Sequence, residues 1–169
     1  ATKRKEIPTF FNIPEKISSG HLEKPDSIQS SLRLGKRIIN RGHQDYPALV
    51  LVNHIFGGYF GSRLMKNIRE EKGLTYGIHS SLNNLRNDAF FVIGADVNRI
   101  NKDIAIAEIK CELNLLCDKP VGIQELQIAR NHLLGSIQLE ISNPFSVIDK
   151  IKTIHLYGLN DDFYNSLFL

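Results

Sequence analysis

Hydrophobic and polar residues alternate strictly in the segment from residue 28 to residue 34. Ile28, Ser30, Leu32 and Leu34 share one face, and glutamine, serine and arginine occupy the other. A period of two predicts a half-buried β-strand. The segments 74–82 and 88–97 are predicted as two further strands, because the turn-rich sequence NNLRND joins them.

Helical spacing predominates in most of the remaining sequence. Asp45, followed by Pro47, marks a helix start with Asp45 as a capping residue. The apolar run that follows continues to Gly57 and Gly58 and predicts a central, buried helix. A second helix from about residue 62 is expected to stop at Gly73. Three more helices are predicted beyond the strands, at about 101–117, after Pro120 as far as Asn143, and from Pro144 to Gly158.

The predicted order of elements is β-α-α-β-β-α-α-α, with adjacent strands joined by a tight turn. This order favours an α+β fold in which helices pack on one face of a largely antiparallel sheet. We expect an N-terminal arm over residues 1–27, with at most one short strand between residues 17 and 22. The α+β domain is expected over 28–169, incomplete at its C-terminus because residues 161–169 resemble a capped helix that has only begun.

Composition adds little to this picture beyond excluding some classes of protein. The 169 residues carry 21 basic and 18 acidic side chains, and the net charge of +3 is too small to indicate nucleic-acid or membrane binding. No apolar run is long enough to span a bilayer. Cys111 and Cys117, six residues apart in a predicted helix, turn to different sides and are expected to be buried and unbridged.

Common catalytic and metal-binding motifs are missing from the sequence. The six histidines lack helical ligand spacing, and neither H-x-x-E-H nor H-E-x-x-H occurs. We therefore expect no metal site in this segment, with His54 as a core or pocket histidine. The glycines of GGYFGSR follow a helix and lack the lysine of a phosphate-binding loop, so they are interpreted as a helix break.

Residues 72–79, KGLTYGIH, partly match an RNA-recognition signature. That signature requires exposed aromatic residues in a strand, but Leu74 and His79 occupy two of its aromatic positions. Tyr76 alone remains, and two successive helices precede the strand. RNA binding is therefore kept only as a remote alternative.

The block NHIFGGYFGSRLMKNIREEKGLTYGIHSSL resembles the pitrilysin and insulinase family of zinc metallopeptidases, which includes the mitochondrial processing peptidases. Upstream, QSSLRLG is similar to the first strand of that family, and ELQIARNHLLGSIQLE is similar to its long helix. The residues that match in order are Asn53, Gly57, Gly58, Ser62, Arg63, Leu64, Arg69, Glu70, Gly73, Leu74 and Tyr76.

The resemblance implies a position within a larger protein. Subunits of that family have two related α+β domains, the first usually carrying the zinc motif and the second the Arg and Tyr of this block. This chain matches the second, so zinc is expected in a partner domain of the same or another chain. A peptide substrate and a second copy of the chain are further expected partners. The compartment stays open, and a soluble or periplasmic bacterial protein is compatible with the sequence.

By the same resemblance, Tyr76 is expected to stabilise the oxyanion at the scissile carbonyl and Arg69 to anchor the substrate. Gly57 and Gly58 are expected to shape the wall of the cleft. Without the family pattern, a buried Tyr76 hydroxyl and an Arg69 paired with Glu70 or Glu71 would be the simpler interpretation. The segment alone is expected to be inactive. A second interpretation is a non-catalytic subunit that assists a separate zinc-bearing partner.

Overall fold

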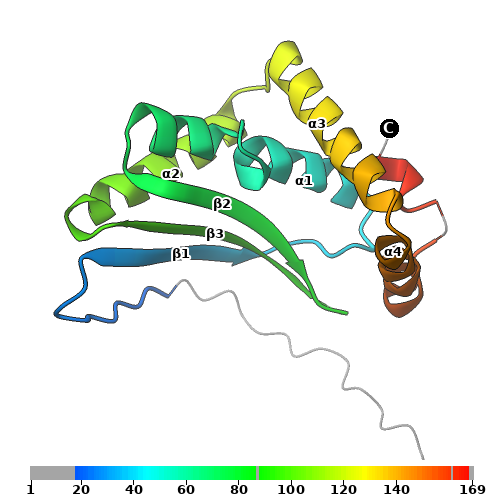
Figure 1. Ribbon diagram of the computed structural model, residues 1–169, viewed down its shortest axis with the longest axis horizontal. Coiled ribbons are helices and arrows are strands. Elements are labelled where there is room, and N and C mark those ends of the chain that lie inside the picture. Colours follow the sequence, from blue (N-terminus) through cyan, green and yellow to red (C-terminus); the bar gives the residue numbers. More distant parts are fainter. Residues whose placement is uncertain (1–17, 87, 161, 168–169) are drawn as a thin grey trace, which may run out of the picture.

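A three-stranded antiparallel sheet forms one layer of the molecule in the computed structural model, which describes residues 18–86, 88–160 and 162–167. Strands β1 (Gln29–Arg37), β2 (Thr75–Asn84) and β3 (Ala89–Asn98) lie in the order β1-β3-β2. The short connection after β2 makes β2 and β3 a hairpin. Both β1 and β2 are therefore edge strands of the described sheet (Figure 1).

The helices form a second layer on one face of this sheet, as expected for the α+β fold (Figure 1). No helix in the described part of the chain covers the opposite face. The helices α1 and α2 lie over the strands, whereas α3 and α4 extend beyond one end of the sheet. In chain order the helical elements are α1 (Tyr46–Asn53), the π-helices η1 (His54–Gly58) and η2 (Met65–Glu71), the 3₁₀ turn η3 (Arg99–Asn101), α2 (Lys102–Asp118), α3 (Ile123–Ile141), α4 (Pro144–Tyr157) and the 3₁₀ turn η4 (Asn165–Leu167).

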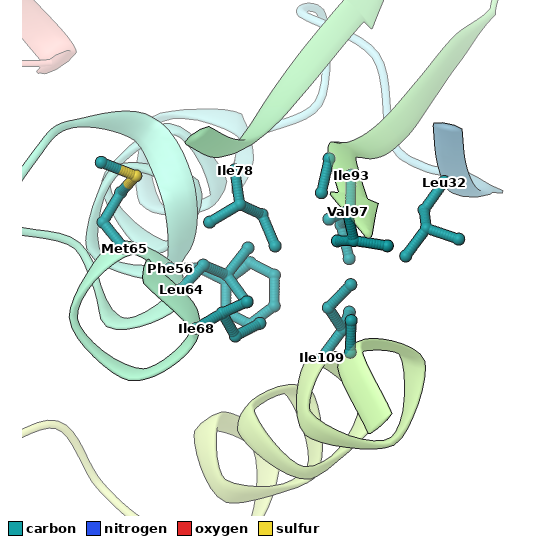
Figure 2. Close-up of a cluster of buried hydrophobic side chains, with 11 residues drawn as sticks. Leu32, Phe56, Leu64, Met65, Ile68, Ile78, Ile93, Val97 and Ile109 are labelled. Carbon is teal, nitrogen blue, oxygen red and sulfur yellow. The ribbon is translucent and has the colours of Figure 1, made fainter. Parts of the chain in front are cut away.

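The core lies between the sheet and the helices η1, η2 and α2. Ile78, Ile93 and Val97 point from the strands toward Phe56 and Ile68 on the helical side (Figure 2). All five side chains are almost completely buried. Burial of such side chains stabilises the fold by roughly 1.5–3 kcal/mol each. The core thus packs the helical part of the block that begins at Asn53 directly against the sheet.

A β-bulge interrupts the pairing of β2 with β3 near the start of β2. Thr75 pairs with Val97 and Ile78 pairs with Ala95, so Tyr76 and Gly77 together face the single residue Asp96. The extra residue on β2 shifts the alternation of side chains by one position. As a result both Thr75 and Ile78 are buried, and the intervening Tyr76 is exposed.

The helix ends agree only partly with the sequence prediction. Gly73, two residues after the end of η2, has φ +61°, and Gly158, after α4, has φ +63°. These are the left-handed conformations expected at helix ends. Asn143 caps α4, because its side chain accepts a hydrogen bond from the backbone N–H of Phe145. Asp45 precedes α1, but its side chain makes no capping hydrogen bond. That part of the prediction was wrong.

Burial along the helices also differs from expectation. Burial in the first helical run is concentrated at its end: His54 and the three residues after it are buried, whereas in α1 only Tyr46 is buried and Val52 is 39% exposed. Cys111 and Cys117 are free thiols, but both are exposed rather than buried. The reason is that α2 contacts the core through Ala105, Ile109 and the partly buried Ile106 and Leu116, whereas both cysteines lie on its exposed surface.

The two ends of the described chain carry little regular structure. Residues 18–22 form no strand, and residue 17 of the expected strand lies outside the described residues. Near the other end, the ring of Phe163 stacks on Tyr46 with 6.2 Å between ring centroids. Among the described residues, no helix combines the length and apolar character needed to cross a membrane.

Candidate functional site

A surface cavity of about 400 Å³ opens beside the start of edge strand β2. One wall is the segment from Gly57 to Phe60, at and after the end of η1, and the other wall comes from β2 at Gly77, Ile78 and His79. The cavity continues onto the uncovered sheet face at Arg33, Gly94 and Asp96. The expected cleft residues Gly57 and Gly58 thus both line it, whereas Arg69 and Tyr76 are not among its lining residues.

Gly57 lets the cavity wall approach β2 closely. A methyl group at Gly57 would lie 2.8 Å from the backbone nitrogen of Ser80 and 2.9 Å from a methyl carbon of Leu64. Contacts this short are not tolerated, so a side chain would push the wall away from the strand. The hydroxyl of Ser80 also donates to Oδ1 of Asn53 at 2.8 Å, which fastens the preceding helix to β2.

Tyr76 projects into solvent from the bulge, with 92% of its surface exposed. The neighbouring Thr75 holds the bulge: its Oγ1 lies 2.6 Å from the carbonyl oxygen of Asp96, to which it donates. Oγ1 of Thr75 also accepts a hydrogen bond from the backbone N–H of Gly77 at 3.2 Å. These bonds replace ladder hydrogen bonds that the bulge removes. The alternative of a buried Tyr76 hydroxyl is therefore wrong.

Arg69 lies near the end of η2, six positions before β2 begins at Thr75. Its guanidinium carbon is 4.6 Å from the ring centroid of Phe60, which is itself a lining residue of the cavity. Arginine stacked on an aromatic ring is held in place while its N–H donors remain available. The described contacts of Arg69 are thus with Phe60 rather than with Glu70 or Glu71.

Ion pairs tie the segment before β2 to the outer helices. Arg63 forms a two-fold interaction with Glu125 at the start of α3, with N–O distances of 2.7 and 2.8 Å. Lys72 pairs with Glu108 of α2 at 2.6 Å. The partner cation lowers the pKa of each carboxyl. These contacts hold both ends of the helical segment that carries Arg69.

A histidine pair connects the cavity wall to α3. Nε2 of His54 lies 3.0 Å from Nδ1 of His132, and the ring of Tyr59 stacks on His54 with 4.6 Å between centroids. Burial, together with the charge of His132, lowers the pKa of His54 from 6.5 to about 4. Sequence reasoning missed this pair, because 78 residues separate its members. Even so, His54 is a pocket histidine as expected, since it is buried and lines a second cavity between α1, α3 and β2.

Sequence reasoning also missed Arg33, His79 and Asp96 on the uncovered sheet face. A signal was available, because these residues occupy outward-facing positions of the predicted strands. Their common location depends on strand order, which the sequence pattern does not specify. Nowhere in the described ranges do three or more histidine, cysteine, aspartate or glutamate side chains gather in an arrangement that could hold a metal ion.

Residues 2–133 match the family model described as the peptidase M16 inactive domain. The chain is 26% identical over 145 residues to the uncharacterized zinc protease YmxG of Bacillus subtilis, covering 84% of this chain and 35% of that protein. It is 29% identical to the non-peptidase homolog YmxG of Helicobacter pylori, over 94% of this chain and 37% of that protein.

Among solved structures, the peptidase M16 inactive domain from Pseudomonas fluorescens superposes with a TM-score of 0.77. The sequences are 26% identical, and the match covers 84% of this chain and 34% of that one. The chain therefore spans about a third of the length of these relatives. The element order, the sheet and the family match agree: the chain belongs to the peptidase M16 family and corresponds to its inactive domain.

Proposed function

We propose that this chain is the substrate-binding domain of a zinc-dependent peptidase. In this proposal Arg69 and Tyr76 contribute to a peptide-binding cleft that is completed by a separate zinc-bearing domain. The observation that carries the proposal is the exposed phenol of Tyr76, held on a bulge by Thr75 beside the cavity. A large exposed aromatic side chain with a dedicated support suits contact with another molecule.

The chemistry of the two side chains fits different tasks in peptide hydrolysis. Attack on a peptide bond places negative charge on the carbonyl oxygen, and a phenolic O–H can donate a hydrogen bond to that charge. The guanidinium of Arg69 offers several N–H donors in a rigid plane, which suits backbone carbonyls or a carboxylate of the peptide. The open edge of β2 adds unpaired backbone groups that an extended peptide can use.

Zinc, in this proposal, is supplied by the partner domain. The name of the Bacillus subtilis relative supports a protease, whereas the name of the Helicobacter pylori relative supports a non-catalytic homolog. The second candidate function is accordingly a non-catalytic subunit that assists a zinc-bearing partner. The complete gene separates the two, because H-x-x-E-H within the same polypeptide would favour the protease.

Arg69→Ala tests the anchoring role in an enzyme reconstituted from this chain and its zinc-bearing domain. We expect KM for an extended peptide to rise by about tenfold and kcat to change less, because anchoring acts in the ground state and the transition state alike. Lys66→Ala is the matched control, since it removes an exposed cation from the same helix. Equal KM values for wild type and Arg69→Ala would contradict the role.

We also expect the isolated chain to self-associate. Helix α4 has no buried residue, and its Phe145, Ile148 and Ile151 are between 60% and 79% exposed. Exposed apolar surface of this kind tends to become covered by another surface. Sedimentation velocity over a hundredfold concentration range, under reducing conditions, should show a rising average mass. A constant monomer mass would contradict this expectation, and Ile148→Lys combined with Ile151→Lys should abolish the rise.

A further inference from the structure

Arg33, Gly94 and His79 form a row across the three strands on the uncovered face of the sheet. Arg33 of β1 pairs with Gly94 of β3, which in turn pairs with His79 of β2. All three residues line the cavity beside β2. The row places one permanent cation and one imidazole on either side of a residue that has no side chain.

The missing side chain at Gly94 brings these two groups together. A methyl group at Gly94 would lie 2.9 Å from Cε1 and 3.1 Å from Nε2 of His79, and 3.5 Å from Nη1 of Arg33. Both side chains therefore lean over the same glycine, which is buried although it lies on the uncovered face. An alanine would force the imidazole away. Gly94 thus forms a floor on the sheet, and the N–H donors of Arg33 and His79 lie above it.

Asp96 is the acidic residue among those that line the cavity. Its Oδ1 lies 3.8 Å from Nη1 of Arg33, and both side chains are more than half exposed. An ion pair at this distance and exposure contributes little, about 0–1 kcal/mol. The guanidinium also donates to the carbonyl oxygen of Leu32 at 2.7 Å, which holds it near the sheet. Arg33 can therefore bind another anionic group at shorter distance, because giving up the ion pair with Asp96 costs little free energy.

We propose that Arg33 and His79 form a carboxylate-binding subsite of the peptide cleft, with Gly94 as its floor. The ligand is an acidic group of a bound peptide, either a glutamate or aspartate side chain or the C-terminal carboxylate. This inference rests on the proposed function, since it names the chemistry that the same cleft prefers. Charge-assisted hydrogen bonds from two donors would orient the peptide along β2.

The test is an NMR titration of the full 169-residue chain, labelled with ¹⁵N, with synthetic hexapeptides of alanine and valine. One set is acetylated and amidated and carries a single glutamate at each successive position, with glutamine counterparts. A further peptide without glutamate has a free C-terminal carboxylate. We expect at least one acidic peptide to bind about 5–10-fold more tightly than its amide counterpart, and to shift the amide signals of Gly94 and His79.

The variants identify the groups responsible. Arg33→Ala and Arg33→Gln should abolish the acidic preference, and His79→Ala should weaken it. Lys36→Ala is the matched control: it removes one cation from the same strand at a position outside the cavity lining, and should keep the preference. Tighter binding of the glutamate set indicates a side-chain carboxylate, whereas preference for the free terminus indicates the C-terminal group.

Two outcomes overturn the inference while leaving the proposed function intact. The first is equal binding of acidic and amide peptides at every position and at the terminus. The second is an equal loss of preference in Arg33→Ala and Lys36→Ala, which would indicate general attraction by positive charge. If no peptide binds the chain at any concentration reached, this inference fails too, and the Arg69→Ala measurement in the reconstituted enzyme still decides the proposed function.

Discussion

Tyr76→Phe is expected to lower kcat by about 10²–10³ in the enzyme reconstituted from this chain and its zinc-bearing domain, which is the effect of removing one oxyanion donor. The change removes a single hydroxyl and keeps the ring. Since the ring is almost fully exposed, the core should not respond. KM should change little, because the hydrogen bond strengthens as charge develops in the transition state.

The measurement is steady-state cleavage of an extended peptide by wild type and variant, with thermal unfolding recorded for both. Tyr164→Phe is the matched control, because it makes the same chemical change in a tyrosine that lines the second cavity instead of standing at the start of β2. It should retain full activity. A folded Tyr76→Phe enzyme that cleaves at the wild-type rate would remove Tyr76 from the chemical step.

Stability is expected to fall by about 2 kcal/mol between pH 7 and pH 5 through His54 alone, as follows from its lowered pKa. The pKa is about 4 in the folded chain and 6.5 ordinarily, so the unfolded chain binds more protons in this window. The contribution of His54 is complete above pH 6.5 and is lost as the pH falls toward 4. Protonation of both histidines would also set two donors against each other at the 3.0 Å contact.

Other charged groups near the histidine pair determine the pH range in which the effect of His54 on stability can be measured. Glu125 pairs with Arg63 and acts on the neighbouring Tyr59, and Arg41, Glu140 and Lys150 line the second cavity with His54. The pKa of Glu125 is lowered by Arg63, so this carboxyl keeps its charge over pH 5–7. Urea unfolding at several values between pH 5 and pH 7 therefore isolates the imidazoles.

His54→Gln should remove most of this slope, whereas His155→Gln, an exposed histidine on α4, should leave it unchanged. Loss of the slope would identify the buried histidine as its source. An unchanged slope in a folded His54→Gln chain would show that the pair does not govern stability in this range.

The hydrophobic pattern predicted the strands but not their irregularity. Alternation at Ile28 to Leu34 correctly indicated the first strand, and the turn-rich segment before Ala89 correctly indicated a hairpin. The pattern could not reveal the bulge. A strict period of two places Tyr76 on the same face as the buried Ile78, whereas the extra residue turns it to solvent. The expectation that Tyr76 points into a cleft came from the resemblance to the peptidase family and not from this alternation.

The sequence pattern identified Gly57 and Gly58 as a helix break, and the family resemblance led us to expect them at a cleft wall. Both line the cavity beside β2, and their role in a peptide cleft stays a prediction. The pair of His54 and His132 depends on the packing of α3 against η1, so no local pattern contains it. Similarly, the row from Arg33 to His79 exists only because β3 lies between β1 and β2.

The block from Asn53 to Tyr76 divides into positions that the fold requires and positions that it does not. Leu64 is fully buried, and Gly57 lies against β2. Arg69 and Tyr76 are on the surface. In a lineage that stopped handling peptides, selection for folding would still preserve the first group, and the second would be free to drift. In a relative that keeps the fold but no longer binds peptides, Arg69 and Tyr76 should therefore be substituted before the buried positions of the block.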